Sequence, residues 1–250
     1  MKRITAKFIM GIFAALIIYI LHAILTTPSI SNIKNCPETY LHKIKLCTEN
    51  PNYINLNEAA DSILQAIIVS EDIHFYQHHG FDYREILNSA EKDLWQMHFA
   101  RGASTISQQV VKNIFFSDKK SIHRKIQEAW LTILLEKNLS KVQILEKYIN
   151  LIELGPNVFG LKQAADIYFH KKPKDLTFLE SAYLAHLLPN PKVYSKSIGT
   201  QKLTPFNRIH VLLICKKLWQ YGYISAAQYL AAQRQLDDFP WFKSSASQDK

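Results

Sequence analysis

Ionisable side chains are concentrated between Ser70 and Asp82, where the sequence reads SEDIHFYQHHGFD. Glu71 and Asp72 stand side by side, and histidines, aromatic residues and a glycine follow them. A buried helix would be destabilised by so many unpaired charges, and a merely solvated loop has no need of the aromatic residues. Carboxylates and imidazoles are the usual groups for proton transfer. The stretch therefore predicts one wall of a functional site.

Two shorter patterns in the chain have chemical interpretations that the surrounding residues do not support. His74 and His78 stand four positions apart, a spacing that can hold a metal on a helix, but the glutamate of the HExxH pattern is missing between them. We expect no zinc there and assign both histidines a structural or orienting role. Residues 117–120 fit the SxxK pattern of penicillin-binding enzymes, yet no KTG accompanies them, so the match is interpreted as coincidence.

A stripe of polar side chains follows in the segment 104–116, STISQQVVKNIFF. Thr105, Gln108, Gln109 and Lys112 fall at i, i+3, i+4 and i+7, which is one face of a helix, while apolar residues take the other face. Periodicity alone favours an ordinary amphipathic helix with a solvated face. Two adjacent glutamines with a lysine one turn later would also suit recognition of sugar hydroxyls and a phosphate.

The segment 121–137 predicts a second helix that carries a carboxylate among cations. Arg124, Lys125, Glu128 and Thr132 share one side, and isoleucines and an alanine take the other. Glu128 is one turn from Arg124, and one interpretation is a helix-stabilising pair worth about 0.2–0.5 kcal/mol. Alternatively, Glu128 is a carboxylate kept charged by two cations beside an anionic substrate. Spacing does not separate these two interpretations.

The elements that must position these residues are helical. Apolar residues recur with helical periodicity in segment after segment, and alternating strand-like runs are nearly absent. We therefore expect a mostly α-helical fold. The helical patterns cover residues 57–67, 104–116, 121–137, 141–151, 176–188, 206–221 and 225–236.

An apolar run of eighteen residues, 8–25, stands near the N-terminus and has no formal charge if His22 is neutral. As a helix it spans about 27 Å, enough to cross a bilayer core. The run lacks the small-residue cleavage site of a secretory signal, so it predicts an uncleaved anchor rather than a buried core helix. Basic residues precede it, which orients residues 1–7 toward the cytoplasm and the rest of the chain outside.

Charge and cysteine content fit that location. Lysine and arginine exceed aspartate and glutamate by 30 to 21, and outside the cytoplasm the available polyanions are lipid headgroups and lipid-linked phosphates, so nucleic acid is not expected as a partner. Cys36 and Cys47 fall in a polar stretch where an oxidising compartment could join them, whereas Cys215 lies in an apolar run and reads as an inert core thiol.

Separated blocks of the sequence resemble, in order, the motifs of the peptidoglycan glycosyltransferases. This family includes monofunctional enzymes and the N-terminal halves of bifunctional penicillin-binding proteins. One block could match by chance, but six in the same order could not. LLPNP at 187–191 and the missing second domain are most similar to monofunctional biosynthetic enzymes of Gram-negative bacteria. The blocks are EDxxFxxHxGxD (71–82), GGSTxTQQ with VVKN (102–113), RKxxE (124–128), ILExYLN (144–150) and those at 155–169 and 180–191.

The resemblance implies a lysozyme-like helical domain that polymerises lipid II and nascent lipid-linked glycan by inverting transfer. By that analogy Glu71 is the general base for the acceptor 4-hydroxyl, and its pKa must be raised for that task. Glu128 is the second catalytic carboxylate, oriented by Arg124, with a Mg or Mn ion possible near it. The implied substrate-binding residues are Asp72, Phe75, His78, Gly80, Ser104, Thr105, Gln108, Gln109, Lys112, Lys120, Arg124, Lys125 and Asn157.

Departures from the family pattern concern the cationic residues. Lys120 stands where many members carry arginine, which loses the bidentate fork that suits phosphate. Gln127 stands where some relatives have lysine, and Ala103 and Ser107 are mild replacements. These changes bear on substrate affinity and metal dependence more than on the reaction.

The expected organisation and the alternatives follow from these observations. A lytic transglycosylase or muramidase would share the fold, but the basic stripe and the anchor favour synthesis at the membrane. A non-catalytic scaffold is disfavoured by the intact Glu71 and Glu128; proteins of the divisome or elongation complex are possible partners. The expected segments are a cytoplasmic N-terminus (1–7), an inner-membrane anchor (8–25), a stalk (26–52), a periplasmic glycosyltransferase domain (53–243) and a disordered tail (244–250).

Overall fold

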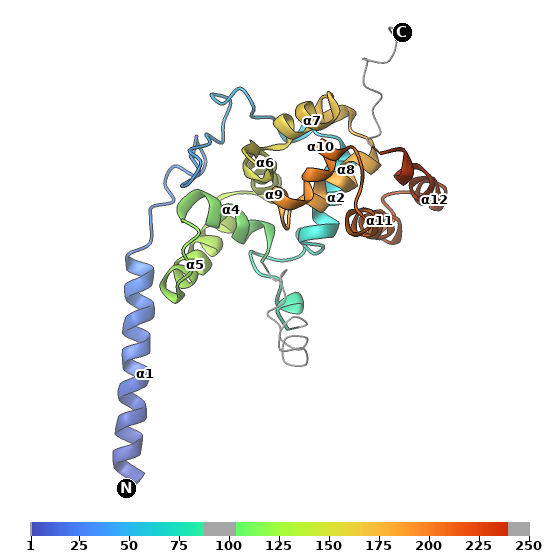
Figure 1. Ribbon diagram of the computed structural model, residues 1–250. Helices are drawn as coiled ribbons and strands as arrows, with labels where there is room; N and C mark the ends of the chain where they lie inside the picture. Colours follow the sequence, from blue (N-terminus) through green and yellow to red (C-terminus); the bar gives the residue numbers. More distant parts are fainter. Residues whose placement is uncertain (1, 88–103, 240–250) are drawn as a thin grey trace, which may run out of the picture.

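The computed structural model describes residues 2–87 and 104–239. Its regular secondary structure is mostly α-helical, with one short hairpin, which confirms the predicted class. One long helix, α1, extends away from a cluster of shorter helices (Figure 1). The predicted tail 244–250 lies outside the described residues, as do Gly102 and Ala103 of the second motif. The helices are α1 (Lys2–Leu25), α2 (Asp61–Glu71), α4 (Ile106–Phe115), α5 (Ile122–Asn138), α6 (Lys141–Leu151), α7 (Leu161–Phe169), α8 (Phe178–Leu187), α9 (Pro191–Tyr194), α10 (Lys196–Thr200), α11 (Pro205–Gln220) and α12 (Ala226–Gln235).

The centre of the domain is α8, which packs against α2 and α11. Every residue from Leu179 to Leu187 is buried, so α8 is a core helix with no solvated face. Its N-terminus is fixed by a capping box in which Thr177 and Glu180 satisfy each other's backbone N–H groups. Cys215 of α11 is buried in the same core, and burial raises the pKa of its thiol to about 12. The prediction of an inert core cysteine is confirmed.

A second group of helices, α4, α5 and α6, packs beside this centre. Thr105, Ser121 and Ser140 stand at their N-caps, and each side chain accepts a hydrogen bond from a backbone N–H in the first turn. A short hairpin, β1 (Glu153–Gly155) and β2 (Val158–Phe159), follows α6 and leads into α7. The caps therefore set where each of the three helices begins.

Helix α1 contains the segment 8–25 for which an anchor is predicted, and it projects from the domain (Figure 1). Among the described residues, no helix combines the length and the apolar character of a membrane span. Past the C-terminal end of α1, the chain contacts α5. Gln127 Nε2 donates to the Thr26 backbone oxygen at 3.0 Å, and His123 lies edge-on to Tyr19 with ring centroids 5.9 Å apart. These contacts hold this end of α1 against α5.

The segment 26–52, predicted as a stalk, packs on the domain over part of its length. Ile33 and Leu46 are buried in the main core, at 2% and 0% exposure. The backbone N–H of Tyr40 donates to the Asn113 carbonyl at 2.9 Å. Cys36 and Cys47 are joined by a disulfide. The segment lacks helical periodicity because its structure comes from this loop closure and from two apolar side chains inserted into the core, which differs from a free stalk.

Candidate active site

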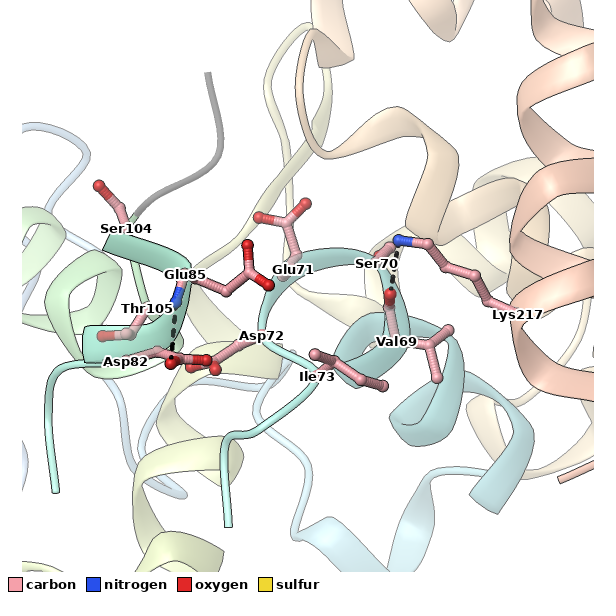
Figure 2. Close-up of a pocket in the computed structure, with 10 residues that line it drawn as sticks. All are labelled: Val69, Ser70, Glu71, Asp72, Ile73, Asp82, Glu85, Ser104, Thr105 and Lys217. Carbon is pink, nitrogen blue, oxygen red and sulfur yellow. Dashed lines mark hydrogen bonds between the residues drawn. The ribbon is translucent and has the colours of Figure 1, made fainter. Parts of the chain in front are cut away.

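Glu71 is the last residue of α2, and its side chain is only partly buried. Gln109 Nε2, from α4, donates to Glu71 Oε2 at 2.8 Å. Gln109 Oε1 in turn accepts from the Tyr148 hydroxyl at 3.2 Å, so the amide is fixed from both sides. Glu71 and nine other residues line a cavity of about 140 Å³ at this end of α2 (Figure 2). A carboxylate at a helix end is thereby held in one place by neutral partners.

Burial raises the pKa of Glu71 above its usual value of 4.5. The hydrogen bond from Gln109 and the charge of Lys217 oppose this shift, and the neighbouring Asp72 adds to it. The balance is a carboxyl group that is a stronger base than an exposed glutamate. The direction expected from the sequence is confirmed, and its main cause is burial.

Asp72 ties the end of α2 to the start of α4. Its Oδ2 accepts from the Ile106 backbone N–H at 2.9 Å, and its Oδ1 is 2.9 Å from His78 Nε2. Asp72 and His78 are both well shielded from solvent. Because both carboxylate oxygens are occupied by protein groups, Asp72 and His78 position Glu71 and the α4 stripe relative to each other.

Asp82 organises the other end of the same motif. Its Oδ2 lies 2.7 Å from His74 Nδ1, and its Oδ1 accepts from the backbone N–H groups of Arg84 and Glu85. Burial alone would raise the pKa of Asp82, but these hydrogen bonds outweigh it and lower the pKa. The two histidines therefore orient carboxylates, as the sequence analysis expects.

A larger cavity, of about 450 Å³, joins the two predicted carboxylates. Glu71 of α2 and Glu128 of α5 both line it, together with Gln109 and Lys112 of α4. Glu128 is 3% exposed, and Lys125 Nζ donates to its Oε1 at 2.6 Å. The full lining comprises Ser70, Glu71, Ser104, Gln108, Gln109, Lys112, Glu128, Leu188 and Pro189.

The partner of Glu128 differs from the one expected. Arg124 was predicted to orient Glu128, but Arg124 Nη1 instead donates to the Ser117 carbonyl at 2.7 Å, and Lys125 makes the ion pair. The reason is geometric, because Lys125 is three positions before Glu128 and Arg124 is drawn back to the loop that precedes α5. Arg124 therefore holds that loop, and the cation beside Glu128 is a lysine.

Helix α5 also presents a different face to the core than its apolar pattern predicts. Glu128 and Thr132 are buried, whereas Ile122 is 75% exposed and Ile133 is 37% exposed. Leu131 and Leu135, on the buried side, supply the packing. The buried glutamate is thus turned toward the cavity at the cost of leaving two isoleucines at the surface.

Several predicted substrate residues lie away from both cavities. Phe75 is fully buried and packs edge-on to Tyr76, and Lys120 is exposed before α5. Gly80 has a φ of +92°, a Cβ there would lie 2.9 Å from Thr132 Cγ2, and its carbonyl accepts from Thr105. Asn157 is exposed in the turn of the hairpin, with a φ of +60°. The buried aromatic and the glycine support the fold of the site, and among the described residues Lys120 and Asn157 line neither cavity.

Sequence reasoning missed several residues that line the two cavities, among them Val69, Glu85 and Lys217. Lys217 of α11 lines the smaller cavity, and its Nζ donates to the Val69 carbonyl at 3.0 Å beside the end of α2 (Figure 2). Leu188 and Pro189 line the larger cavity. Leu188 and Pro189 belong to the LLPNP segment that resembles a family motif, so the sequence contained a signal that could have identified them. No sequence signal identified Lys217, since it is one of several lysines in a helical segment with an amphipathic pattern.

The residues near Glu128 offer few ligands for the expected divalent cation. Among the described residues, no cluster of three histidine, cysteine, aspartate or glutamate ligand atoms includes Glu128 or Glu71. One Glu128 oxygen is already paired with Lys125. Mg²⁺ is commonly held by one or two carboxylates, with waters and substrate phosphates completing its shell. The site fits that substrate-completed mode and no all-protein cage.

Comparison with known proteins gives consistent matches. The sequence model of one family, described as Transglycosylase, matches residues 37–213. A Biosynthetic peptidoglycan transglycosylase of Nitrosomonas eutropha is 41% identical over 157 residues, 63% of this chain and 64% of that protein. One of Acinetobacter baumannii is 39% identical over 157 residues, 63% and 70% respectively. Penicillin-binding protein 1F of Bacillus subtilis is 35% identical over 207 residues, 80% of this chain but 28% of that protein. The matches thus span less than two thirds of the Nitrosomonas and Bacillus proteins.

Proposed function

Because this chain belongs to the transglycosylase family, we propose that it polymerises lipid II into peptidoglycan glycan strands. The names of two relatives, Biosynthetic peptidoglycan transglycosylase, support synthesis rather than cleavage. The observation that carries the proposal is the shared cavity, in which Glu71, Glu128 and Lys112 meet two glutamine side chains. Two carboxylates with a cation and hydrogen-bonding amides suit a sugar that carries a diphosphate.

The proposed reaction is a single displacement. The 4-hydroxyl oxygen of the acceptor sugar attacks the anomeric carbon of the donor chain, and Glu71 takes the hydroxyl proton. The bond from the anomeric carbon to the pyrophosphate oxygen breaks, and its electron pair leaves with the pyrophosphate. The raised pKa of Glu71 supports this role, since a general base works best when its pKa approaches the working pH. Inversion at the anomeric carbon follows.

Lys112 and Lys125 receive the leaving group in this proposal. Lys112 is 42% exposed and pairs at 3.2 Å with Asp118, which is 75% exposed. Such an exposed pair is weak, so a pyrophosphate can replace the aspartate at little cost. Cations placed where negative charge grows stabilise the transition state. Glu128 keeps Lys125 beside the cavity, and it would hold a divalent cation whose charge stabilises the pyrophosphate.

We also propose that α1 anchors the chain in the inner membrane with the helical domain in the periplasm. Large apolar side chains of α1 are exposed where the helix leaves the domain, with Ile18 at 66% and Leu25 at 84% exposure. The expected result is that the protein stays with membranes after carbonate washing, and that lysines at Ile18 and Leu21 release it. Retention of the doubly substituted chain would contradict the anchor.

The decisive experiment is incubation of the full chain, in detergent, with labelled lipid II, followed by gel separation of the products. We expect long glycan from the wild-type protein and from a surface control, Lys137→Met. A parallel reaction contains isolated sacculi, from which a lytic enzyme would release muropeptides. A product ladder supports the proposal, whereas muropeptides without a ladder favour cleavage, and neither product favours a scaffold. Chelation with EDTA tests the divalent cation, since lost synthesis restored by Mg²⁺ is the expected result.

A further inference from the structure

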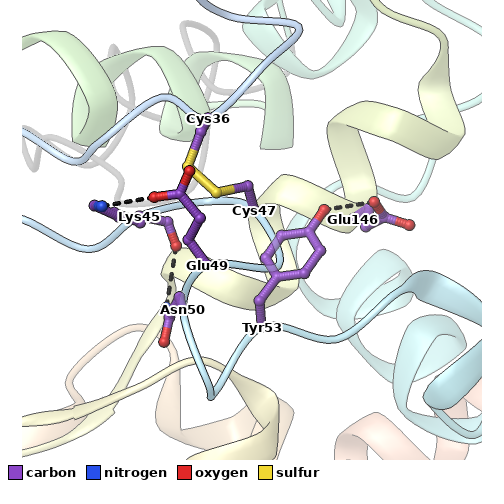
Figure 3. The surroundings of a disulfide bond; sticks show 7 residues. All are labelled: Cys36, Lys45, Cys47, Glu49, Asn50, Tyr53 and Glu146. Atoms are coloured by element: carbon purple, nitrogen blue, oxygen red, sulfur yellow. Dashed lines mark hydrogen bonds and ion pairs between the residues drawn. A yellow bond between two sulfur atoms is a disulfide. The ribbon is translucent and has the colours of Figure 1, made fainter.

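A separate cavity of about 200 Å³ lies between the disulfide-bonded segment and helix α6. Leu46 and Leu139 form its apolar part, and polar side chains complete it. Figure 3 shows its surroundings, with the Cys36–Cys47 disulfide on one side and Tyr53 beside Glu146 on the other. None of its lining residues lines either of the two cavities that contain Glu71. The proposed glycosyltransfer therefore leaves this cavity without a role.

Lys147 of α6 is the notable residue of this cavity. It lines the cavity, yet it is only 5% exposed. Within the described residues its ammonium group makes no hydrogen bond or ion pair, in contrast to Lys141 and Lys171, which each pair with a buried glutamate. Burial lowers the pKa of Lys147, and the charge of Glu146 opposes this shift without cancelling it. Buried lysines are normally paired, and a lysine at a cavity wall without a hydrogen-bonded partner among the described residues suits an anionic ligand.

Glu146 attracts Lys147 electrostatically, but its two carboxylate oxygens accept hydrogen bonds from other groups. Glu146 Oε1 accepts from the Tyr53 hydroxyl at 2.5 Å, and Glu146 Oε2 accepts from the Leu56 backbone N–H at 2.9 Å. Both oxygens are therefore used to hold the segment after the disulfide. Lys34, in the same lining, adds a second cation. Two lysines face one committed carboxylate, which leaves the cavity with excess positive charge.

We propose that this cavity binds a phosphate group, with Lys147 as the buried cation that pairs with it. Lys34 approaches from the exposed side, and the hydroxyl of Thr48 and the amides of Asn35 and Asn55 line the same space and offer donors to further oxygens. Lysine is a common phosphate ligand, acting as a point charge. The group can be inorganic phosphate or the phosphate of a lipid headgroup, because both present the same oxygens.

The disulfide determines whether this site exists. Cys47 itself lines the cavity, and Leu46 and Thr48 flank it in the lining. Joining Cys47 to Cys36 fixes these three residues against α6, so an oxidising compartment preserves the cavity wall. Reduction of the disulfide should weaken phosphate binding at this site without touching Glu71 or Glu128.

Equilibrium dialysis with labelled inorganic phosphate, and with glycerol phosphate as a soluble headgroup mimic, tests the site on the full chain in detergent. We expect the wild-type protein to bind phosphate at this site, Lys147→Met to lose that binding, and Lys147→Arg to keep most of it. Binding of glycerol phosphate but not of phosphate would identify a headgroup. Lys112→Met must keep the Lys147-dependent binding, because it changes only the larger cavity.

Thermal unfolding provides a second measurement. A lysine with only a structural role would not give a phosphate-dependent rise in Tm. Phosphate at saturating concentration should raise the Tm of the wild-type chain by about 2 °C or more relative to sodium chloride of equal ionic strength. The shift should be retained in Lys137→Met, an exposed control, and lost in Lys147→Met. Equal shifts in all variants, or no binding by the wild-type protein in dialysis, would overturn the proposal. The dialysis result does not depend on glycosyltransfer, so the two proposals fail separately.

Discussion

The two carboxylates of the larger cavity stand in contrasting surroundings. Glu71, at the end of α2, receives a hydrogen bond from the neutral amide of Gln109, and burial raises its pKa. Glu128, on α5, is more deeply shielded at 3% exposure but carries the ammonium of Lys125 at 2.6 Å. A neutral donor stabilises the carboxylate charge of Glu71 too little to offset burial, so its pKa stays raised, whereas a cation such as Lys125 pairs with the charge of Glu128 directly.

This difference separates two roles within one cavity. A carboxylate made basic by burial can take a proton, and one paired with lysine serves as a fixed charge that holds a cation near the substrate. If this difference in role is correct, substitutions of Glu71 and Glu128 should differ in the size of their effect on activity and in how that effect depends on pH. The following expectations test it from the largest effect to the smallest.

Glu71→Gln should abolish synthesis. The amide keeps the shape of the side chain and can still accept from Gln109, but it cannot take a proton. We expect the rate of glycan synthesis from lipid II to fall by about 10³-fold, within the range usual for loss of a general base. Initial rates from the gel assay measure it, and far-ultraviolet circular dichroism checks the fold. Full activity of this variant would remove Glu71 from the mechanism.

Glu128→Gln should have a smaller effect. The substitution removes the charge that holds Lys125 while keeping a hydrogen-bond acceptor for it. We expect kcat/KM for lipid II to fall by about tenfold, equal to ~1.4 kcal/mol of transition-state stabilisation. A loss as large as that of Glu71→Gln would break the contrast, because it would give both carboxylates an equal share in proton transfer. Lys137→Met, on the exposed side of the same helix, is the matched control.

The fold could be predicted from the sequence where one periodic signal acted alone. Helix α4 follows its apolar pattern, with Ile106, Val110 and Ile114 buried as expected, although Gln108 of the polar stripe is buried as well. Helix α5 does not, because Glu128 and Thr132 are turned inward and Ile122 is left at the surface. Hydrophobic periodicity identifies the more apolar face of a helix. It does not show which polar side chains are turned inward to line a cavity.

The site was predictable to a similar degree. Glu71, Glu128, Gln109 and Lys112 meet in one cavity, as the motifs imply. Lys217 was missed, since it comes from α11 and reaches the end of α2 only through tertiary packing. The sequence also did not show that Lys125, and not Arg124, pairs with Glu128. Both cations lie within one turn of the glutamate, and they differ only because Arg124 donates to the Ser117 carbonyl in the loop before α5.

Lys217→Met should change how activity depends on pH. The charge of Lys217 lowers the pKa of Glu71, so its removal should raise that pKa further. A base must be deprotonated to act, so the acidic limb of the kcat/KM profile should move to higher pH in the variant, with little change on the plateau. Rates measured from pH 5 to 9 provide the profile. An unchanged limb would mean that another group controls it.

The smallest expected effect is on thermal stability. It distinguishes a carboxylate whose charge is disfavoured by burial, Glu71, from one whose charge is paired with a lysine, Glu128. The folded pKa of Glu71 lies above its usual value of 4.5, so the folded state binds the proton more tightly than the unfolded state. The free energy of unfolding contributed by this group is therefore greatest below pH 4.5 and decreases as pH rises through the folded pKa. The Glu71→Gln variant has no carboxyl group to titrate at this position, so its Tm should exceed that of the wild-type protein at pH 8. The difference in Tm should shrink as the pH is lowered toward 5.

The same comparison for Glu128→Gln should show no gain in Tm at pH 8, since that substitution removes a charge that is paired with Lys125. A gain of equal size in both variants would mean that Lys125 does not compensate Glu128, and the contrast between the two carboxylates would fail.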